Sequence, residues 1–147
     1  MALLPEVQKH YGKLKFYING SWVVSESDLV YEDVNPATGE VIAEFPSATD
    51  SEIEAAIDAA QGAVAKWREV PLRDKARYLF DLRGKFEEHF ERLCRVLVQD
   101  HGRTIGEARG TLRRCIENIE SACSALLLTK GECVTDLAKG LDQALYW

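Results

Sequence analysis

The sequence predicts a mainly helical chain in which antiparallel β-hairpins precede three long amphipathic helices. Apolar residues alternate with a period of two over residues 15–45, and they recur every three to four residues over residues 50–130. Units in which strand and helix alternate, from which a parallel sheet is built, are missing from this pattern. The elements therefore resemble the outer layer of a larger α/β domain, which we take as the parent fold.

The composition indicates one folded globular domain. The 147 residues include 24 acidic and 18 basic side chains, with a net charge of −6 and 46% hydrophobic content. This acidic balance argues against nucleic acid as a partner, because phosphate binding needs clustered Lys and Arg. No run approaches the ~20 apolar residues of a membrane span, so we expect no membrane association and a cytoplasmic location without a cleaved leader.

Two β-hairpins are predicted in the first third of the chain, after a polar lead-in over residues 1–13. In Lys15–Val24, alternating apolar residues flank Asn19-Gly20, a pair that tolerates positive φ and favours a tight turn. The segments 29–34 and 40–45 bracket the turn sequence NPATG in the same way. We therefore expect strands within residues 15–45.

The first helix is expected over residues 50–69. Its apolar positions fall on one helical face, and Thr49 with Glu52 three residues later has the spacing of a capping box. In such a box each side chain accepts a hydrogen bond from a backbone N–H that the helix start leaves unpaired.

The second helix is expected over residues 71–100 and to end at Gly102. A helix of about 30 residues is long for a globular domain. We therefore expect a kink or a break between Arg83 and Glu91, with Gly84 making a bend possible.

The third helix is expected over residues 104–130. Thr104 and Glu107 repeat the capping-box spacing, and the apolar stripe that follows is the cleanest in the chain. Residues 132–140 are expected to form a loop, and residues 141–147 to begin a strand.

The cysteines are expected to act as apolar packing residues. Cys115 and Cys123 lie about two helical turns apart and so share the apolar face of the third helix, while Cys94 and Cys133 show no stronger pattern. A nucleophilic or redox role is the alternative.

Two glycine-containing segments resemble phosphate-binding motifs only in part. Gly102–Thr104 lacks the glycine and lysine of a phosphate loop, which favours a helix N-cap instead. Gly106 and Gly110 lie within a predicted helix without a preceding strand, so we expect them to allow close helix packing.

The remaining charged and titratable residues predict local roles. Surface or capping roles are expected for the three histidines, and the adjacent Glu87 and Glu88 diverge around a helix, so they do not form an acid/base pair. The third helix carries a basic segment interleaved with glutamates, which predicts a salt-bridged face, with an anionic ligand or partner as the alternative. These residues are His10, His89 and His101, and Arg103, Arg109, Arg113 and Arg114.

Several motifs in a fixed order resemble the N-terminal region of NAD(P)-dependent aldehyde dehydrogenases. They are YINGSW (Tyr17–Trp22), VNPATGEVIAEFPSATDSEIEAAIDAA (34–60) and VLVQDHGRTIGEARGTL (96–112). The resemblance implies that residues 14–147 form the N-terminal part of the family's NAD-binding domain, with 141–147 starting a strand of its oligomerisation arm. ESACSALLLTKGE (120–132) resembles the methylmalonate-semialdehyde branch, whose members form acyl-CoA.

The resemblance also implies what this chain lacks. Family enzymes oxidise aldehydes to acids or acyl-CoA with a nucleophilic Cys, a general-base Glu, an oxyanion-binding Asn and a bound NAD or NADP, and none of these residues matches a position here. Some relatives bind a monovalent cation near the positions of Val34 and Asp100, but that ligand set is incomplete in this sequence. We therefore assign no catalytic, cofactor-binding or metal residue, and expect the chain alone to be inactive.

Self-association is the expected partnership. The apolar helical stripes would face the missing part of such a domain, and exposed apolar patches promote association, so a dimer or higher oligomer is expected. The aldehyde would be a ligand of the complete enzyme only. The alternatives are a non-catalytic helical oligomerisation or interaction module, and a thiol sensor or metal protein.

Overall fold

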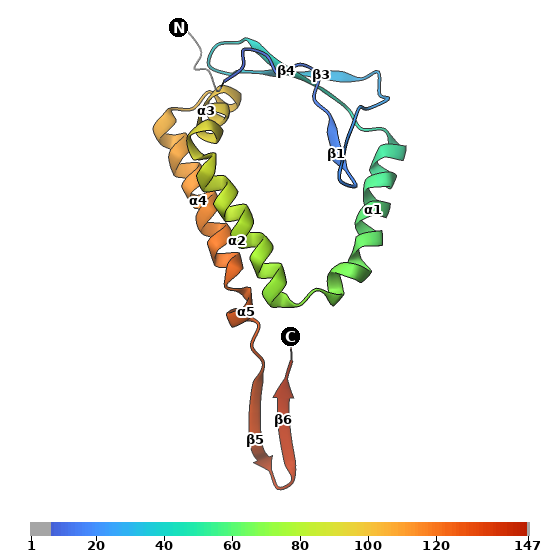
Figure 1. The fold of residues 1–147 in the computed structure, drawn as a ribbon, viewed down its shortest axis with the longest axis vertical. Coiled ribbons are helices and arrows are strands. Elements are labelled where there is room, and N and C mark those ends of the chain that lie inside the picture. The colour runs from blue at the N-terminus through green and yellow to red at the C-terminus, as the bar shows by residue number, and fades with distance from the viewer. Residues whose placement is uncertain (1–6, 147) are drawn as a thin grey trace. The chain divides into compact units, whose positions relative to one another are not determined.

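The computed structural model describes residues 7–146, except for the side chain of Leu126. Within these described residues, six strands and five helices follow one another. Figure 1 shows their course. They divide into two compact units, the first made of residues up to Glu69 together with His89–Arg113, and the second of Val70–Glu88 and the residues from Arg114 onward. We describe each unit by itself.

The first hairpin forms as predicted. Strands β1 (Phe16–Ile18) and β2 (Ser21–Val23) pair antiparallel. The turn residues Asn19 and Gly20 have φ of 49° and 77°, positive values that asparagine and glycine tolerate better than other residues. The rings of Tyr17 and Trp22 lie 5.0 Å apart across the pair, which adds a cross-strand contact.

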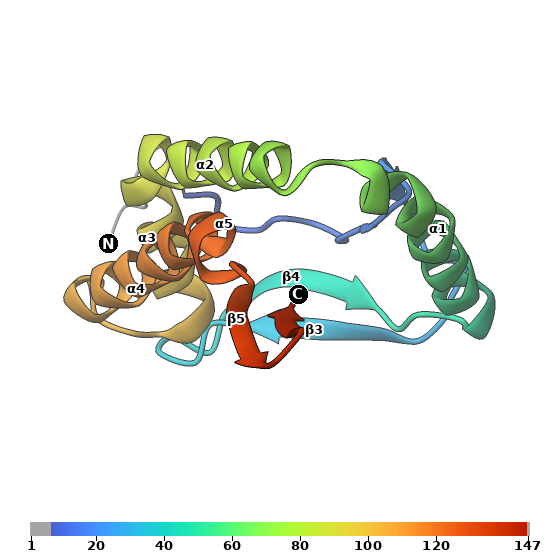
Figure 2. The same cartoon turned by 90° about the horizontal axis from the view of Figure 1, so that it is seen from below.

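The second hairpin is also confirmed, and it supplies a buried strand. Strands β3 (Val30–Val34) and β4 (Val41–Pro46) pair antiparallel, side by side in Figure 2, with an irregularity in register between Asp33 and Val34. Ile42 and Ala43 are buried, at 3% and 2% exposure. This strand is the β-sheet contribution to the core of the first unit.

Residues 7–13, the described end of the predicted polar lead-in, pair with β4; residues 1–6 lie outside the described part. The N–H of Tyr11 donates to the carbonyl of Ile42 at 2.7 Å, and Lys13 forms a parallel bridge with Glu44. The segment is short and its side chains are mixed in polarity, so periodicity does not reveal the pairing. What fixes it is the free edge of β4, whose backbone groups need partners.

The first helix, α1, covers Asp50–Glu69, the range predicted. Its capping box forms as expected, since the N–H of Thr49 donates to Oε2 of Glu52 at 2.8 Å and the N–H of Glu52 donates to Oγ1 of Thr49 at 3.3 Å. The same carboxylate accepts from Oγ of the buried Ser25, which ties the preceding loop to the helix start. No residue of α1 itself is buried.

The second predicted helix breaks where a break was expected. It consists of α2 (Leu72–Glu88) and α3 (Phe90–His101), separated at His89 rather than at Gly84. Gly102 ends α3 with a φ of 64°, and its N–H donates to the carbonyl of Val98 at 2.8 Å. The left-handed conformation explains the glycine at this position.

The third predicted helix is shorter than expected. It consists of α4 (Ile105–Cys123) and a single turn, α5 (Ala125–Leu128), so the range 104–130 is wrong at its end. Oγ of Ser121 donates to the carbonyl of Glu117, and the N–H of Ser124 donates three residues back to Ser121. Serine hydroxyls that bond to the backbone one turn earlier favour bends, and the interruption follows there.

The prediction of a loop over residues 132–140 is wrong. Residues Glu132–Ala138 form strand β5, which pairs antiparallel with β6 (Leu141–Leu145). Asp136 has a φ of 53°, its N–H donates to Oδ1 of Asp142, and the register shifts around it. This bulge interrupts the alternation of side chains on which strand prediction depends.

Each unit has a small core on its own helices. In the first unit, Cys94 of α3 and Ala108 and Leu112 of α4 are buried at 0 to 8% exposure, and in the second, Ala76, Ile116 and Cys123 are buried at 8% or less. The predicted apolar stripe of the third helix is thus confirmed in its central part. Within residues 7–146, no helix has the length and apolar character needed to cross a bilayer.

Candidate functional site

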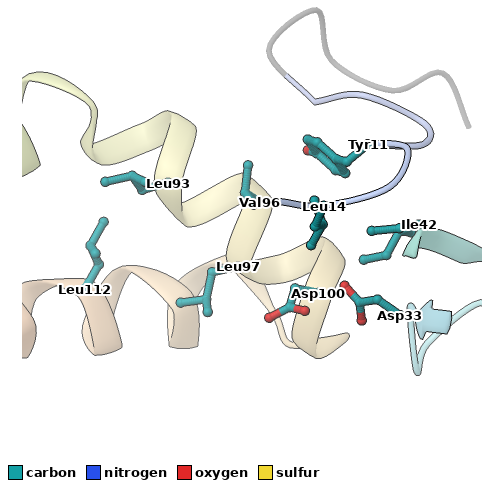
Figure 3. Close-up of a pocket in the computed structure, with 10 residues that line it drawn as sticks. Tyr11, Leu14, Asp33, Ile42, Leu93, Val96, Leu97, Asp100 and Leu112 are labelled. Carbon is teal, nitrogen blue, oxygen red and sulfur yellow. The ribbon is translucent and has the colours of Figure 1, made fainter. Parts of the chain in front are cut away.

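An apolar cavity of about 400 Å³ lies within the first unit (Figure 3). Its walls come from the segment before β1, from the β3–β4 hairpin, from α3 and from the start of α4. Aliphatic side chains make up most of the lining, and the side chains of Asp33 and Asp100 approach one another at one end. The lining residues are Tyr11, Leu14, Asp33, Ile42, Ala43, Leu93, Val96, Leu97, Asp100 and Leu112.

One buried amide positions the wall that precedes β1. The side chain of Gln99, only 7% exposed, donates through Nε2 to the carbonyl of Gln8 at 2.8 Å and accepts at Oε1 from the Tyr11 hydroxyl at 3.1 Å. Both hydrogen bonds run from α3 to a segment about 90 residues earlier. This amide therefore pins the segment against α3.

The two carboxylates carry the polar character of the cavity. Partial burial raises the pKa of Asp33, and the neighbouring Asp100 carboxylate raises it further, while His101 lowers it. Asp100 is itself 2.9 Å from Nε2 of His101. The pair offers acidic oxygens to a cation or shares a proton, depending on pH.

Two motifs far apart in sequence meet beside the cavity. A Cβ on Gly102 would lie 2.9 Å from the backbone nitrogen of Ala37 and from Cγ of Pro36, so the NPATG turn packs directly on the end of α3. Oδ1 of Asn35 accepts from the N–H of Ala37 and holds this turn in shape. Gly102 thus serves packing, and Thr104 forms the predicted capping box with Glu107.

The expectation for Gly106 and Gly110 is wrong. A Cβ at either position would meet no other atom within 4 Å, so neither glycine allows a close helix contact in this structure. The i, i+4 spacing places both on one side of α4, but that side is open. Sequence spacing alone does not reveal which side of a helix is covered.

The four cysteines differ in burial. Cys94 and Cys123 are buried, Cys115 is half-buried, and Cys133 is exposed on β5. Burial raises the pKa of the Cys94 thiol, with the Glu91 carboxylate adding to the effect, so the thiolate needed of a nucleophile is disfavoured. Packing is confirmed for Cys94 and Cys123, whereas Cys133 does not fit the apolar packing role.

In the basic segment of α4 the predicted salt bridge is confirmed at Arg109, although its partner lies on another helix. Arg109 donates from Nε and Nη2 to both carboxylate oxygens of Glu91 on α3, at 2.9 and 2.8 Å, and lowers the pKa of Glu91. The guanidinium of Arg113 lies 4.7 Å from the ring centre of Phe90. These contacts join α3 to α4.

The other predicted local roles are also confirmed. Glu87 pairs with Arg83 at 3.3 Å and Glu88 with Lys85 at 2.8 Å, so the two carboxylates point to different partners. The three histidines His10, His89 and His101 are exposed; Nδ1 of His10 accepts from the N–H of Gly12, whereas His89 precedes α3 without a side-chain capping bond.

The described residues do not fit a dinucleotide or a metal ion. Every sheet over residues 7–146 is two-stranded and antiparallel, whereas a dinucleotide site requires the carboxyl edge of a parallel sheet and a glycine-rich turn before a helix. In the same residues no group of three or more His, Cys, Asp or Glu side chains is arranged to hold a metal. Asp33 and Asp100 alone leave a cation short of ligands.

Comparison with known proteins defines the class. The sequence model described as "Aldehyde dehydrogenase family" matches residues 22–145, so the chain belongs to this family. Among its relatives is a malonate-semialdehyde dehydrogenase of Listeria monocytogenes serotype 4b, 39% identical over 134 residues. The match covers 91% of this chain and 28% of that relative, so the chain spans little more than a quarter of its length.

Solved structures agree in fold. The methylmalonate-semialdehyde dehydrogenase of Oceanimonas doudoroffii superposes with a TM-score of 0.82 at 36% identity, over 90% of this chain and 27% of that one. A Sinorhizobium meliloti 1021 protein assigned the same activity, crystallised with NAD, also gives a TM-score of 0.82, at 30% identity over 92% and 27% of the two chains. The mainly helical architecture with small antiparallel hairpins is therefore part of the aldehyde dehydrogenase fold.

Proposed function

We propose that the chain is the N-terminal part of an NAD(P)-dependent dehydrogenase that oxidises malonate or methylmalonate semialdehyde. The observation that carries the proposal is the match to relatives of this activity, at 36 to 39% identity over nine-tenths of the chain. In the family, NAD or NADP accepts hydride from the substrate, and the acyl group passes to water or CoA. In this proposal the cofactor and the aldehyde bind only to the complete enzyme.

The chain by itself is proposed to be inactive. Covalent catalysis on an aldehyde needs an accessible thiolate, and the buried Cys94 has a raised pKa while Cys123 is also buried. Cys133 is exposed, but it lies on a hairpin in which no residue is buried. Cys115 is half-buried, and none of the four cysteines is among the described residues that line the cavity.

The role proposed for the described residues is structural support. The NPATG turn packs on the end of α3 at Gly102, Gln99 holds the segment before β1 against α3, and the Glu91–Arg109 pair joins α3 to α4. The β5–β6 hairpin is proposed to begin the oligomerisation arm. A cytoplasmic location belongs to the same proposal and is tested by cell fractionation.

A chimaera tests the proposal. Residues 14–146 would replace the matching segment of the Listeria malonate-semialdehyde dehydrogenase, and NADH formation would be followed at saturating malonate semialdehyde, with and without CoA. We expect at least a tenth of the parent activity, because the packed segment should support the same catalytic residues. A chimaera carrying Ile116→Asp in the buried α4 position is the matched control for misfolding.

A well-folded chimaera of the parent's oligomeric size without activity would contradict the proposal. A second measurement uses the chain alone. Titration with NAD in a calorimeter should show no saturable binding, and a micromolar dissociation constant would contradict the absence of a cofactor site.

A further inference from the structure

Residues 7–14 lie along the free edge of β4, and we call this segment the strap. The N–H of Tyr11 donates to the carbonyl of Ile42 at 2.7 Å, and the N–H of Leu14 donates to the carbonyl of Glu44 at 2.7 Å. The N–H of Glu44 donates in return to the carbonyl of Gly12 at 3.0 Å. The strap therefore meets β4 through backbone groups, as a peptide does when it adds a strand to a sheet edge.

A buried amide on α3 also holds the strap. Nε2 of Gln99 donates to the carbonyl of Gln8 at 2.8 Å, and Oε1 accepts from the Tyr11 hydroxyl at 3.1 Å. One side chain thus recognises a backbone carbonyl and a phenolic hydroxyl of the strap. Tyr11 and Leu14 also line the apolar cavity (Figure 3).

The residues that receive the strap are more buried than the strap itself. Ile42, Ala43 and Gln99 are 3, 2 and 7% exposed, whereas none of residues 7–14 is buried. The receiving elements also have contacts of their own, because β4 pairs with β3 and an ion pair between Glu91 and Arg109 joins α3 to α4. We therefore expect them to keep their positions when the strap is released.

The conformation of Gly12 makes the strap's fit selective. Its φ is 73°, and a Cβ at this position would meet no atom within 4 Å. An L-residue here is strained by its backbone, whereas a D-residue fits both the backbone and the open space. The handedness of this residue therefore distinguishes binding in the strap's conformation from non-specific apolar association.

We propose that the edge of β4 and Gln99 of α3 form a peptide-binding groove, which the chain's own strap occupies. The ligand is an extended peptide with a phenolic side chain, then a residue with positive φ, and an apolar side chain two positions later. A separate peptide of this kind can make the same hydrogen bonds as Tyr11, Gly12 and Leu14. The proposal does not rest on the proposed enzymatic function, which the chimaera tests separately.

Release of the strap in the full chain tests the groove. Proline cannot adopt a φ of 73°, so Gly12→Pro should free the strap without changing a groove residue. The probe is a fluorescent synthetic peptide of residues 7–15, VQKHYGKLK, followed by anisotropy. We expect saturable binding to this variant and at least tenfold weaker binding to the unaltered chain, because the tethered strap competes at an effective concentration on the order of millimolar.

Gly140→Pro is the matched control for the protein. Gly140 also has a positive φ, 77°, but it lies in the turn between β5 and β6. This variant should bind the peptide no better than the unaltered chain does.

Variants of the peptide test the two selective contacts. With D-alanine in place of Gly12 the peptide should bind the Gly12→Pro chain at least as tightly, and with L-alanine about tenfold more weakly. With phenylalanine in place of Tyr11 it should bind about threefold to tenfold more weakly, because one hydrogen bond is lost. This last difference should vanish when the chain also carries Gln99→Ala.

Several results would overturn the proposal. One is a folded Gly12→Pro chain, verified by circular dichroism, that shows no saturable binding of the peptide. Another is equal binding of the D-alanine and L-alanine peptides, or a preference for tyrosine over phenylalanine that survives Gln99→Ala. Should Gly12→Pro fail to fold, Tyr11→Ala replaces it in the titration; unfolding of both variants would contradict a groove that stands without its strap.

Discussion

Helices α1 and α4 have similar sequence signals, but in this structure α4 contains buried residues and α1 contains none. Both begin with a capping box and carry apolar residues at helical spacing. Yet α4 buries Ala108, Leu112 and Ile116 to 8% exposure or less, whereas α1 buries no residue. A periodic stripe therefore predicts that a helix forms and which side is apolar, but not whether the chain itself supplies the cover.

The largest expected difference between the two helices is in how far the free energy of unfolding falls when an apolar side chain is truncated. Ile116→Ala should lower the free energy of unfolding by about 2–4 kcal/mol, because it leaves a cavity in the core. Ile57→Ala should cost about 0.5 kcal/mol, since it removes only surface contacts. Urea titration measures both, and equal costs would contradict the comparison.

Removing the buried amide should have the next largest effect. Gln99→Ala should cost about 1–3 kcal/mol because the hydrogen bonds to Gln8 and Tyr11 are lost. Gln61→Ala on the exposed side of α1 is the matched control, expected within about 0.5 kcal/mol. Proteolysis of the segment before β1 should accelerate only in the Gln99 variant; unchanged cleavage there would argue against the pinning role.

Alanine substitutions at two glycines extend the comparison between packed and open positions. Gly102→Ala should destabilise the chain by about 1–2 kcal/mol, because φ is 64° and the added Cβ meets Ala37. Gly62→Ala should stabilise by about 0.4–1 kcal/mol, since the position in α1 is helical and open. Thermal unfolding of the two variants should therefore shift in opposite directions, and shifts of the same sign would contradict the assignment.

The smallest expected effect concerns pH. The pKa of Asp33 is raised in the folded state, so its protonation favours folding, and this stabilisation is present below the unfolded pKa and lost as pH rises through the folded pKa. Asp33→Asn should therefore raise the melting temperature at pH 7, and the difference should shrink toward zero at about pH 3–4. A stabilisation that grows on acidification would have the wrong sign.

Local features of the fold could be predicted from the sequence because local chemistry determines them. The turn at Asn19-Gly20, the boxes at Thr49 and Thr104 and the end at Gly102 each depend on residues within one turn of the chain. Strand β6 was expected, whereas β5 was missed because the bulge at Asp136 removes the alternation.

The candidate site could be predicted less well from the sequence than the local features of the fold. Asp33 and Asp100 are 67 positions apart, and only tertiary packing brings their carboxylates together. Gln99 had a weak signal, since it lies three residues after Val96, on the packed side of α3, where a polar residue needs partners. No sequence signal reveals that Gly106 and Gly110 lie on an uncovered side of α4, because this depends on which neighbours pack against the helix.

Hydrogen exchange of the full chain tests the contrast between α1 and α4 most directly. Amides of α4 should be protected and those of α1 should exchange rapidly, because only α4 is packed by the chain itself. Strong protection of α1 that equals that of α4 would contradict this account.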